Sequence, residues 1–134
     1  MSYDISLYEP SFLRSAVVSG LGDWTAAPPF SVEVRHAIID AAEAEGFIAS
    51  PHPPGFIEFL QAQGVTPSTD YRLATSQYDL LLQVFDSSAT LTVQANGNAS
   101  SSIAFGCRFG QRLAKQLRLG YYDPQEGEVS YGEV

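Results

Sequence analysis

Side chains suited to acid–base or metal chemistry are scarce in this sequence of 134 residues, which contains two histidines and one cysteine. His36 stands four residues before Asp40, so a helix would place both on one face, where a carboxylate can orient an imidazole for proton transfer. The same pair could hold a metal ion, but a zinc site takes at least three protein ligands. We therefore expect a solvated helix face there. A small-molecule-binding or hydrolytic site around His36, Asp40 and Trp24 is the alternative.

The other histidine and the cysteine are also expected to be inactive. His52 stands in the stiff segment Pro51-His52-Pro53-Pro54 with no obvious carboxylate partner, which indicates a surface residue. Cys107 falls among apolar residues, where we expect a buried, unreactive thiol. The sequence shows no glycine-rich phosphate loop, no Cys or His cluster at metal-ligand spacing and no serine at a strand–turn–helix elbow. The protein is accordingly predicted not to be an enzyme and to use no cofactor or metal.

The strongest periodic pattern lies in residues 101–118 and predicts an amphipathic helix that ends near Gly120. Its apolar arc comprises Ile103, Gly106, Cys107, Phe109, Gly110, Leu113, Ala114 and Leu117, and its opposite arc comprises Arg108, Gln111, Arg112, Lys115, Gln116 and Arg118. Each glycine in a helix costs about 1 kcal/mol relative to alanine, so Gly106 and Gly110 suggest a close backbone neighbour. The alternative is a strand over residues 102–109.

Shorter patterns predict the remaining elements. Alternation and β-formers indicate strands at 3–8, 71–75, 79–85, 89–95, 119–122 and 128–131. Apolar periodicity bounded by Pro, Ser and Gly indicates helices at 11–19, 32–45 and 55–63. Gly127 suits the left-handed position of the last hairpin, and Trp24 is expected to plug the core. Residues 1–134 are thus predicted to form one α+β domain, an antiparallel sheet of four to six strands with three to four helices packed on one face.

Charge narrows the class of partner. The formal net charge is −8, and residues 1–100 carry eleven acidic against three basic side chains. Residues 101–118 carry four basic side chains and no acidic one. An acidic surface argues against nucleic acid and anionic membranes as partners and suits a basic protein. Without a signal-peptide or membrane-spanning pattern, we expect a soluble cytoplasmic protein, either a monomer or a homodimer.

Two segments carry a family resemblance. They are Leu80-Leu81-Leu82-Gln83-Val84-Phe85-Asp86 with Leu91-Thr92-Val93, and Gly120-Tyr121-Tyr122-Asp123-Pro124-Gln125. With the helix between them, they resemble a group of small acidic bacterial proteins that have a β-hairpin, an amphipathic helix and a closing Tyr-Asp-Pro-Gln turn. These in turn resemble the immunity proteins of bacterial toxin and antagonism systems. Members often carry Pro-Tyr-Trp after the hairpin, where this chain has Ala95-Asn96-Gly97.

The resemblance implies a protein that binds a cognate toxin and blocks its active surface, while its motif residues serve the framework. Acidic side chains would attract the basic toxin, and exposed aromatics with a mobile end at 125–134 would add contact area. The residues expected to meet the toxin are Glu33, Asp40, Glu43, Trp24, Glu126 and Glu128. A structural subunit of a larger assembly is a further alternative.

Overall fold

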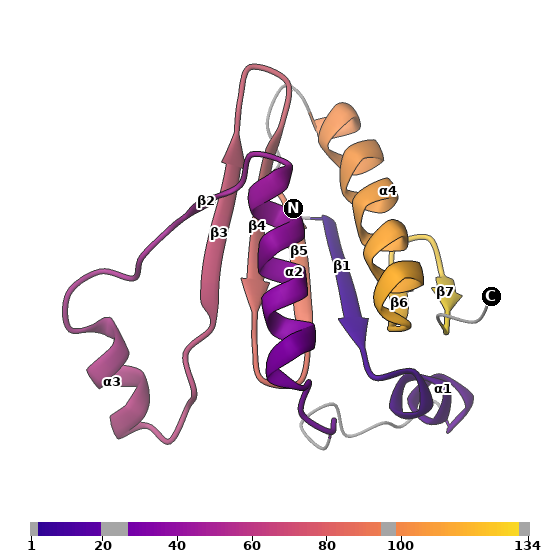
Figure 1. Cartoon of the computed structure of the whole chain (residues 1–134), viewed down its shortest axis with the longest axis horizontal. Coiled ribbons are helices and arrows are strands. Elements are labelled where there is room, and N and C mark those ends of the chain that lie inside the picture. Colours follow the sequence, from indigo (N-terminus) through magenta and orange to yellow (C-terminus); the bar gives the residue numbers. More distant parts are fainter. Residues whose placement is uncertain (1–2, 20–26, 95–98, 132–134) are drawn as a thin grey trace.

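The centre of the fold is an antiparallel sheet, seen in a computed structural model that describes residues 3–19, 27–94 and 99–131 (Figure 1). Its strand order is β2-β3-β4-β5-β1-β6-β7. The elements are β1 (Tyr3–Tyr8), α1 (Pro10–Ser19), α2 (Val32–Ala44), β2 (Ile48–Ala49), α3 (Phe56–Ala62), β3 (Thr69–Ala74), β4 (Asp79–Val84), β5 (Ala89–Val93), α4 (Ala99–Leu117), β6 (Gly120–Asp123) and β7 (Glu128–Ser130).

The predicted α+β class is confirmed, and the sheet has seven strands rather than four to six. The additional strand is β2, whose two residues are too short to leave an alternating pattern. The strand alternative for residues 102–109 is wrong, because they lie inside α4. Ser31 caps α2 as its sequence suggests, since its hydroxyl accepts a hydrogen bond from the Val34 amide at 3.1 Å. Gly127 adopts the predicted left-handed conformation, with φ of 67°.

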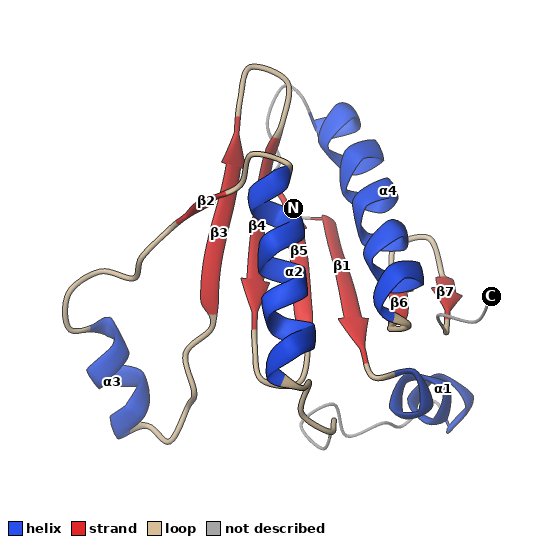
Figure 2. Ribbon diagram, in the orientation of Figure 1, coloured by secondary structure: helices blue, strands red, loops and turns tan. Residues whose placement is uncertain are grey.

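One face of the sheet forms the core. Alternate residues of β4, Leu80, Leu82 and Val84, are buried and point to this face. The helices α2 and α4 lie across the face (Figure 2), and their buried side chains Ile38, Phe109 and Leu113 belong to the same cluster as those of the strands. The buried side chains of the strands and those of α2 and α4 therefore pack together in a single apolar layer.

The helix α4 sits close to the sheet through its two glycines. A Cβ atom on Gly110 would lie 3.0 Å from Cε2 of Tyr121, and one on Gly106 would lie 3.1 Å from Cδ2 of Leu80. The expected close neighbour is present, but it consists of side chains and not of backbone. The glycines let α4 descend onto large side chains of β4 and β6, which explains why they stand on the buried arc.

The prediction of helices on one face holds for α2 and α4 and fails for α1. A Cβ atom on Gly120 would lie 2.5 Å from Cδ2 of Leu13, so α1 packs directly on this glycine. The next residue, Tyr121, reaches α4. Because successive residues of a strand point to opposite faces, α1 and α4 lie on opposite faces of β6.

No helix in the described residues is long and apolar enough to cross a membrane.

Tyr121→Phe should change the stability near neutral pH by less than about 1 kcal/mol, because the buried Tyr121 hydroxyl donates to no nitrogen or oxygen atom of the described residues and has only the weakly hydrogen-bonding Cys107 thiol beside it. Burial raises the pKa of Tyr121 above its ordinary value of 10.0, so the folded state keeps a proton that the unfolded state releases. The resulting stabilisation is complete below pH 10 and is lost as the pH rises toward the folded-state pKa. Urea denaturation at neutral and alkaline pH should give the variant a shallower alkaline loss. A loss above about 1 kcal/mol at pH 7 would show that the hydroxyl makes a strong hydrogen bond in the folded protein.

Candidate functional site

An apolar cavity of about 460 Å³ lies between α3 and the end of the sheet. Phe56 and Leu60, one turn apart on α3, line one side, and Val65 and Pro67 line the segment that follows. Phe85 lines the side formed by the sheet. The volume lies within the range of about 300–1,000 Å³ typical of ligand pockets, so the space is large enough for a bulky apolar group.

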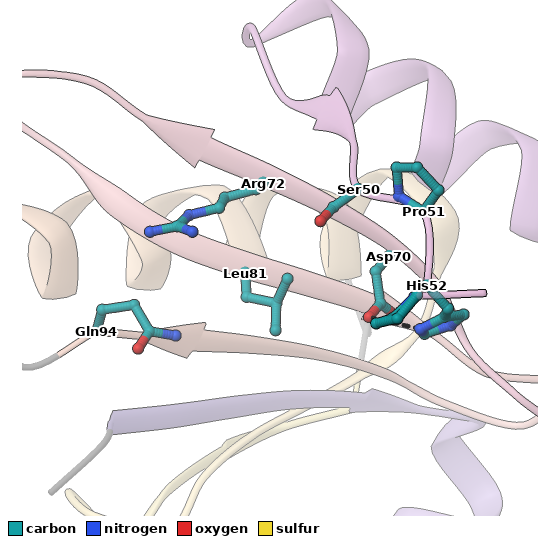
Figure 3. A pocket seen from close by; sticks show the side chains of 8 residues that line it. Ser50, Pro51, His52, Asp70, Arg72, Leu81 and Gln94 are labelled. Atoms are coloured by element: carbon teal, nitrogen blue, oxygen red, sulfur yellow. Dashed lines mark ion pairs between the residues drawn. The ribbon is translucent and has the colours of Figure 1, made fainter. Parts of the chain in front are cut away.

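A second, more polar cavity of about 320 Å³ adjoins the first (Figure 3). Arg72, Leu81 and Gln94 lie on its sheet side, and Ser50 and Pro51 lie on the loop opposite. The two cavities share three lining residues, which are His52, Pro53 and Asp70. We call the two together the open-face groove.

The groove lies on the face of the sheet opposite α2 and α4. Asp70 pairs with Gln83 and Arg72 pairs with Leu81, so these four side chains point to one side of the sheet. They alternate with Leu73, Leu80, Leu82 and Val84, which are buried beneath the helices. The groove floor is therefore the face that α2 and α4 leave uncovered.

His52 holds the outer wall of the groove, and its prediction as a partnerless surface residue is wrong. Its Nε2 lies 2.7 Å from the backbone oxygen of Ser68, and its Nδ1 lies 3.8 Å from Oδ2 of Asp70. Its ring also contacts that of Phe56, with centroids 5.2 Å apart. The partners are 16 and 18 residues away in the chain, so neither could be read from the segment around His52.

The geometry around His52 suits support of the loop better than proton transfer. A carbonyl oxygen only accepts hydrogen bonds, so Nε2 must carry a hydrogen and donate it to Ser68. The Ser68 hydroxyl in turn donates to Asp70, so it does not face the imidazole as a nucleophile would. Through these contacts, His52, Ser68 and Asp70 attach the loop between β2 and α3 to the start of β3.

Arg72 is also engaged within the chain. Its Nε and Nη2 donate to Oδ1 of Asp79 at 3.2 and 3.0 Å, and Nη2 donates to Oδ2 at 3.2 Å. A forked contact of this kind fixes the guanidinium beside the groove floor and balances its charge. The described residues contain no group of three or more side chains that could hold a metal ion.

The helix α3 is unusual because none of its residues is buried. Phe59 is 60% exposed and Ile57 is 41% exposed, and the neighbouring Val65 is 48% exposed. Ile48 in the edge strand β2 is 74% exposed. We call Phe56, Ile57, Phe59 and Val65 the α3 surface. Phe56 and Val65 also line the larger cavity, so the α3 surface continues into the open-face groove and presents apolar side chains to solvent.

The predicted partner-binding residues do not line this groove. Glu33, Asp40 and Glu43 are exposed on α2, as their helical positions suggest, and His36 is exposed on the same helix. Glu126 and Glu128 are exposed in the hairpin at the opposite edge of the sheet, where Glu128 accepts a hydrogen bond from Gln111. The structure thus leaves these acids on two separate elements. Trp24 and the turn at 96–98 lie outside the described residues.

The Tyr-Asp-Pro-Gln turn is held by hydrogen bonds within the chain. Asp123 is fully buried and accepts hydrogen bonds from the Tyr3 hydroxyl, from the Gln125 amide at 3.1 Å and from the Glu126 amide at 3.2 Å. The Gln125 side chain pairs with the backbone of Asp4, donating to its oxygen at 2.7 Å and accepting from its nitrogen at 2.9 Å. Within the end expected to be mobile, Gln125 is therefore anchored to Asp4, and residues 128–130 pair with β6.

Cys107 lies beside the same network. It is predicted to be buried and is half-buried in the structure. Its Sγ is 3.9 Å from Oδ2 of Asp123, so the thiol belongs to the polar contacts that close the turn. Burial raises the pKa of Tyr3, with the hydrogen bond to Asp123 adding to the shift, which keeps the phenol neutral as a donor.

One signal in the sequence could have indicated the α3 surface. Residues 56–60 place four apolar side chains in five positions, Phe56, Ile57, Phe59 and Leu60. A short helix cannot bury all four against one neighbour, because they spread over too wide an arc. Which of them remained uncovered depended on where the sheet ended. Comparisons with protein-family models, with curated proteins and with solved structures found no match to this chain.

Proposed function

We propose that this chain is a non-enzymatic protein-binding protein of the cytoplasm that neutralises a cognate bacterial toxin by covering its active surface. The observation that carries the proposal is the α3 surface, where Phe56, Ile57, Phe59 and Val65 are all exposed. Exposed apolar side chains concentrated at one end of a protein are typical of protein-binding sites, and aromatic residues dominate binding energy. The toxin itself is inferred from the family resemblance.

Charge supports a basic partner. The net charge is −8, and Glu33, Asp40 and Glu43 are exposed on α2. An acidic field raises the rate of encounter with a basic protein, while apolar contacts slow its dissociation. The two surfaces have different roles in the proposal, since the acids attract the toxin and the α3 surface holds it.

The contacts of the polar side chains favour binding over hydrolysis. His52 donates through Nε2 to Ser68, and Arg72 is paired with Asp79. His36 and Asp40 lie on α2 and line neither cavity of the open-face groove. Polar groups engaged in this way fix the shape of a surface for a partner.

Phe59→Ser should weaken binding to the product of the adjacent gene by about 2 kcal/mol, close to thirtyfold, because it removes an exposed aromatic contact. Titration calorimetry would measure the change, and growth rescue of cells that express the adjacent gene would report neutralisation. His36→Ala on α2 is the matched control and should change neither quantity. Both variants alter exposed residues, so their melting temperatures should stay close to that of the parent.

The same complex allows the steering role to be measured separately. Reversing Asp40 and Glu43 to lysine should slow association and leave dissociation nearly unchanged, and rising salt should slow the association of the parent protein. Absence of binding and of growth rescue by the parent chain would refute the toxin-neutralising function. An affinity that Phe59→Ser leaves unchanged would show that the α3 surface does not contact the partner.

A further inference from the structure

We propose that the cavity of about 460 Å³ beneath α3 receives one bulky apolar side chain, carried by a lysine- or arginine-rich segment of the partner protein. This rests on the proposed protein-binding function and specifies the chemistry that the surface recognises. The occupant follows from the cavity lining, from the charge around it and from the fastening of its walls.

The lining of the cavity selects an apolar group. Phe56 and Leu60 of α3 face it from one side, and Phe85 faces it from the sheet. Val65 and Pro67 complete the apolar part of the wall. Burying an aromatic or long aliphatic side chain there removes apolar surface on both partners from water, which is the main favourable term in association.

The charge around the cavity selects a basic carrier. Residues 46–71, which include α3 and both of its connections, contain two acidic side chains, Glu58 and Asp70, and no lysine or arginine. Glu58 is exposed on α3, and Asp70 belongs to the walls of both cavities. The nearest cation of the groove, Arg72, is balanced by Asp79. A segment with basic residues beside its apolar side chain complements this surface.

The same charges disfavour a second copy of the chain as the occupant. A two-fold contact through α3 would bring identical surfaces together, so each Glu58 would approach the acidic surface of the other copy. Like charges facing each other across an interface are unfavourable. A basic heterologous segment avoids this repulsion and gains attraction instead.

The cavity walls are held in place before any partner binds. His52 is fastened to Ser68 and lies within ion-pair distance of Asp70, while its ring contacts Phe56 at the start of α3. The loop before α3 is thus tied to β3 by contacts among residues that themselves line the cavity. A preformed wall lowers the entropy lost on binding, which favours recognition of a short segment.

A model peptide with a central phenylalanine flanked on each side by two lysines tests the proposal on the full chain. Titration monitored by ¹H–¹⁵N NMR should shift signals of Phe56, Leu60, Val65 and Phe85 in a saturable manner. Replacing the phenylalanine of the peptide by alanine, or its lysines by glutamates, should weaken binding by about tenfold or more. Shifts on α2 instead of the groove, or no saturable shift, would overturn the proposal. So would α3 signals that change on dilution without peptide, because they would identify self-association.

Two variants of the chain close the test. Thr66→Trp should fill the cavity and Val65→Lys should repel the basic segment, and each should weaken peptide binding by about tenfold. Thr69→Trp is the matched control, because Thr69 is exposed and lines neither cavity, and it should change binding less than twofold. If neither Thr66→Trp nor Val65→Lys weakened binding of the adjacent gene's product, the cavity proposal alone would be overturned. Peptide binding without neutralisation would leave the cavity proposal standing and refute the toxin-neutralising function.

Discussion

Leu113→Asp is expected to abolish the folded state of this protein. Leu113 is 1% exposed and belongs to the core cluster between α4 and the sheet, next to Phe109 and Ala114. An aspartate there would bury a carboxyl group without a partner and would also lose the packing of the leucine. The combined cost of about 5 kcal/mol is comparable to the whole stability of many domains. Far-ultraviolet circular dichroism and thermal melting should show loss of the cooperative transition.

A control on the same helix separates the core from helix formation. Gln116→Asp introduces the same side chain three residues later, at an exposed position of α4. It should cost less than about 1 kcal/mol, mainly through the unfavourable position of a negative charge near the helix C-terminus. A folded Leu113→Asp protein with a melting temperature close to that of the control would contradict the packing of α4 on the sheet.

Asp123→Ala is expected to destabilise the protein by about 3 kcal/mol, because it removes the buried acceptor of four partly buried hydrogen bonds. The side chain accepts from the Tyr3 hydroxyl, from two nitrogens of Gln125 and from the Glu126 amide. Loss of this acceptor also releases the Gln125 side chain, which pairs with Asp4 across 121 residues of sequence. Urea denaturation should show a lower midpoint, and hydrogen exchange should show faster exchange in β1, β6 and β7.

Two further variants test whether the loss comes from the acceptor role of Asp123. Asp123→Asn keeps one acceptor oxygen but turns an amide donor toward other donors, so its loss should be intermediate. Glu126→Ala changes an exposed side chain of the same turn and should alter the stability by less than about 0.5 kcal/mol. Equal losses for Asp123→Asn and Asp123→Ala would contradict an acceptor network, and a large loss for Glu126→Ala would attribute it to the turn conformation.

Local physics determined much of the fold from the sequence alone. The apolar periodicity of residues 101–118 predicts α4 within two residues of its observed ends, Ala99–Leu117. Alternation of side chains predicts β1 and β5. Ser31 caps α2 and Gly127 is left-handed, both as the surrounding sequence predicts. Each of these features depends on residues a few positions apart, where backbone sterics and side-chain spacing decide the outcome.

Tertiary structure alone decided the candidate site and the anchoring of the C-terminal turn. His52 finds Ser68 and Asp70 only because β3 passes beside its loop, and Asp123 meets Tyr3 only because β1 and β6 are neighbours. The apolar residues of α3 look as buried in the sequence as those of α2, yet α2 lies over the sheet while α3 has no buried residue. Burial and long-range pairing depend on which surfaces remain after the sheet is assembled, and no local pattern contains that information.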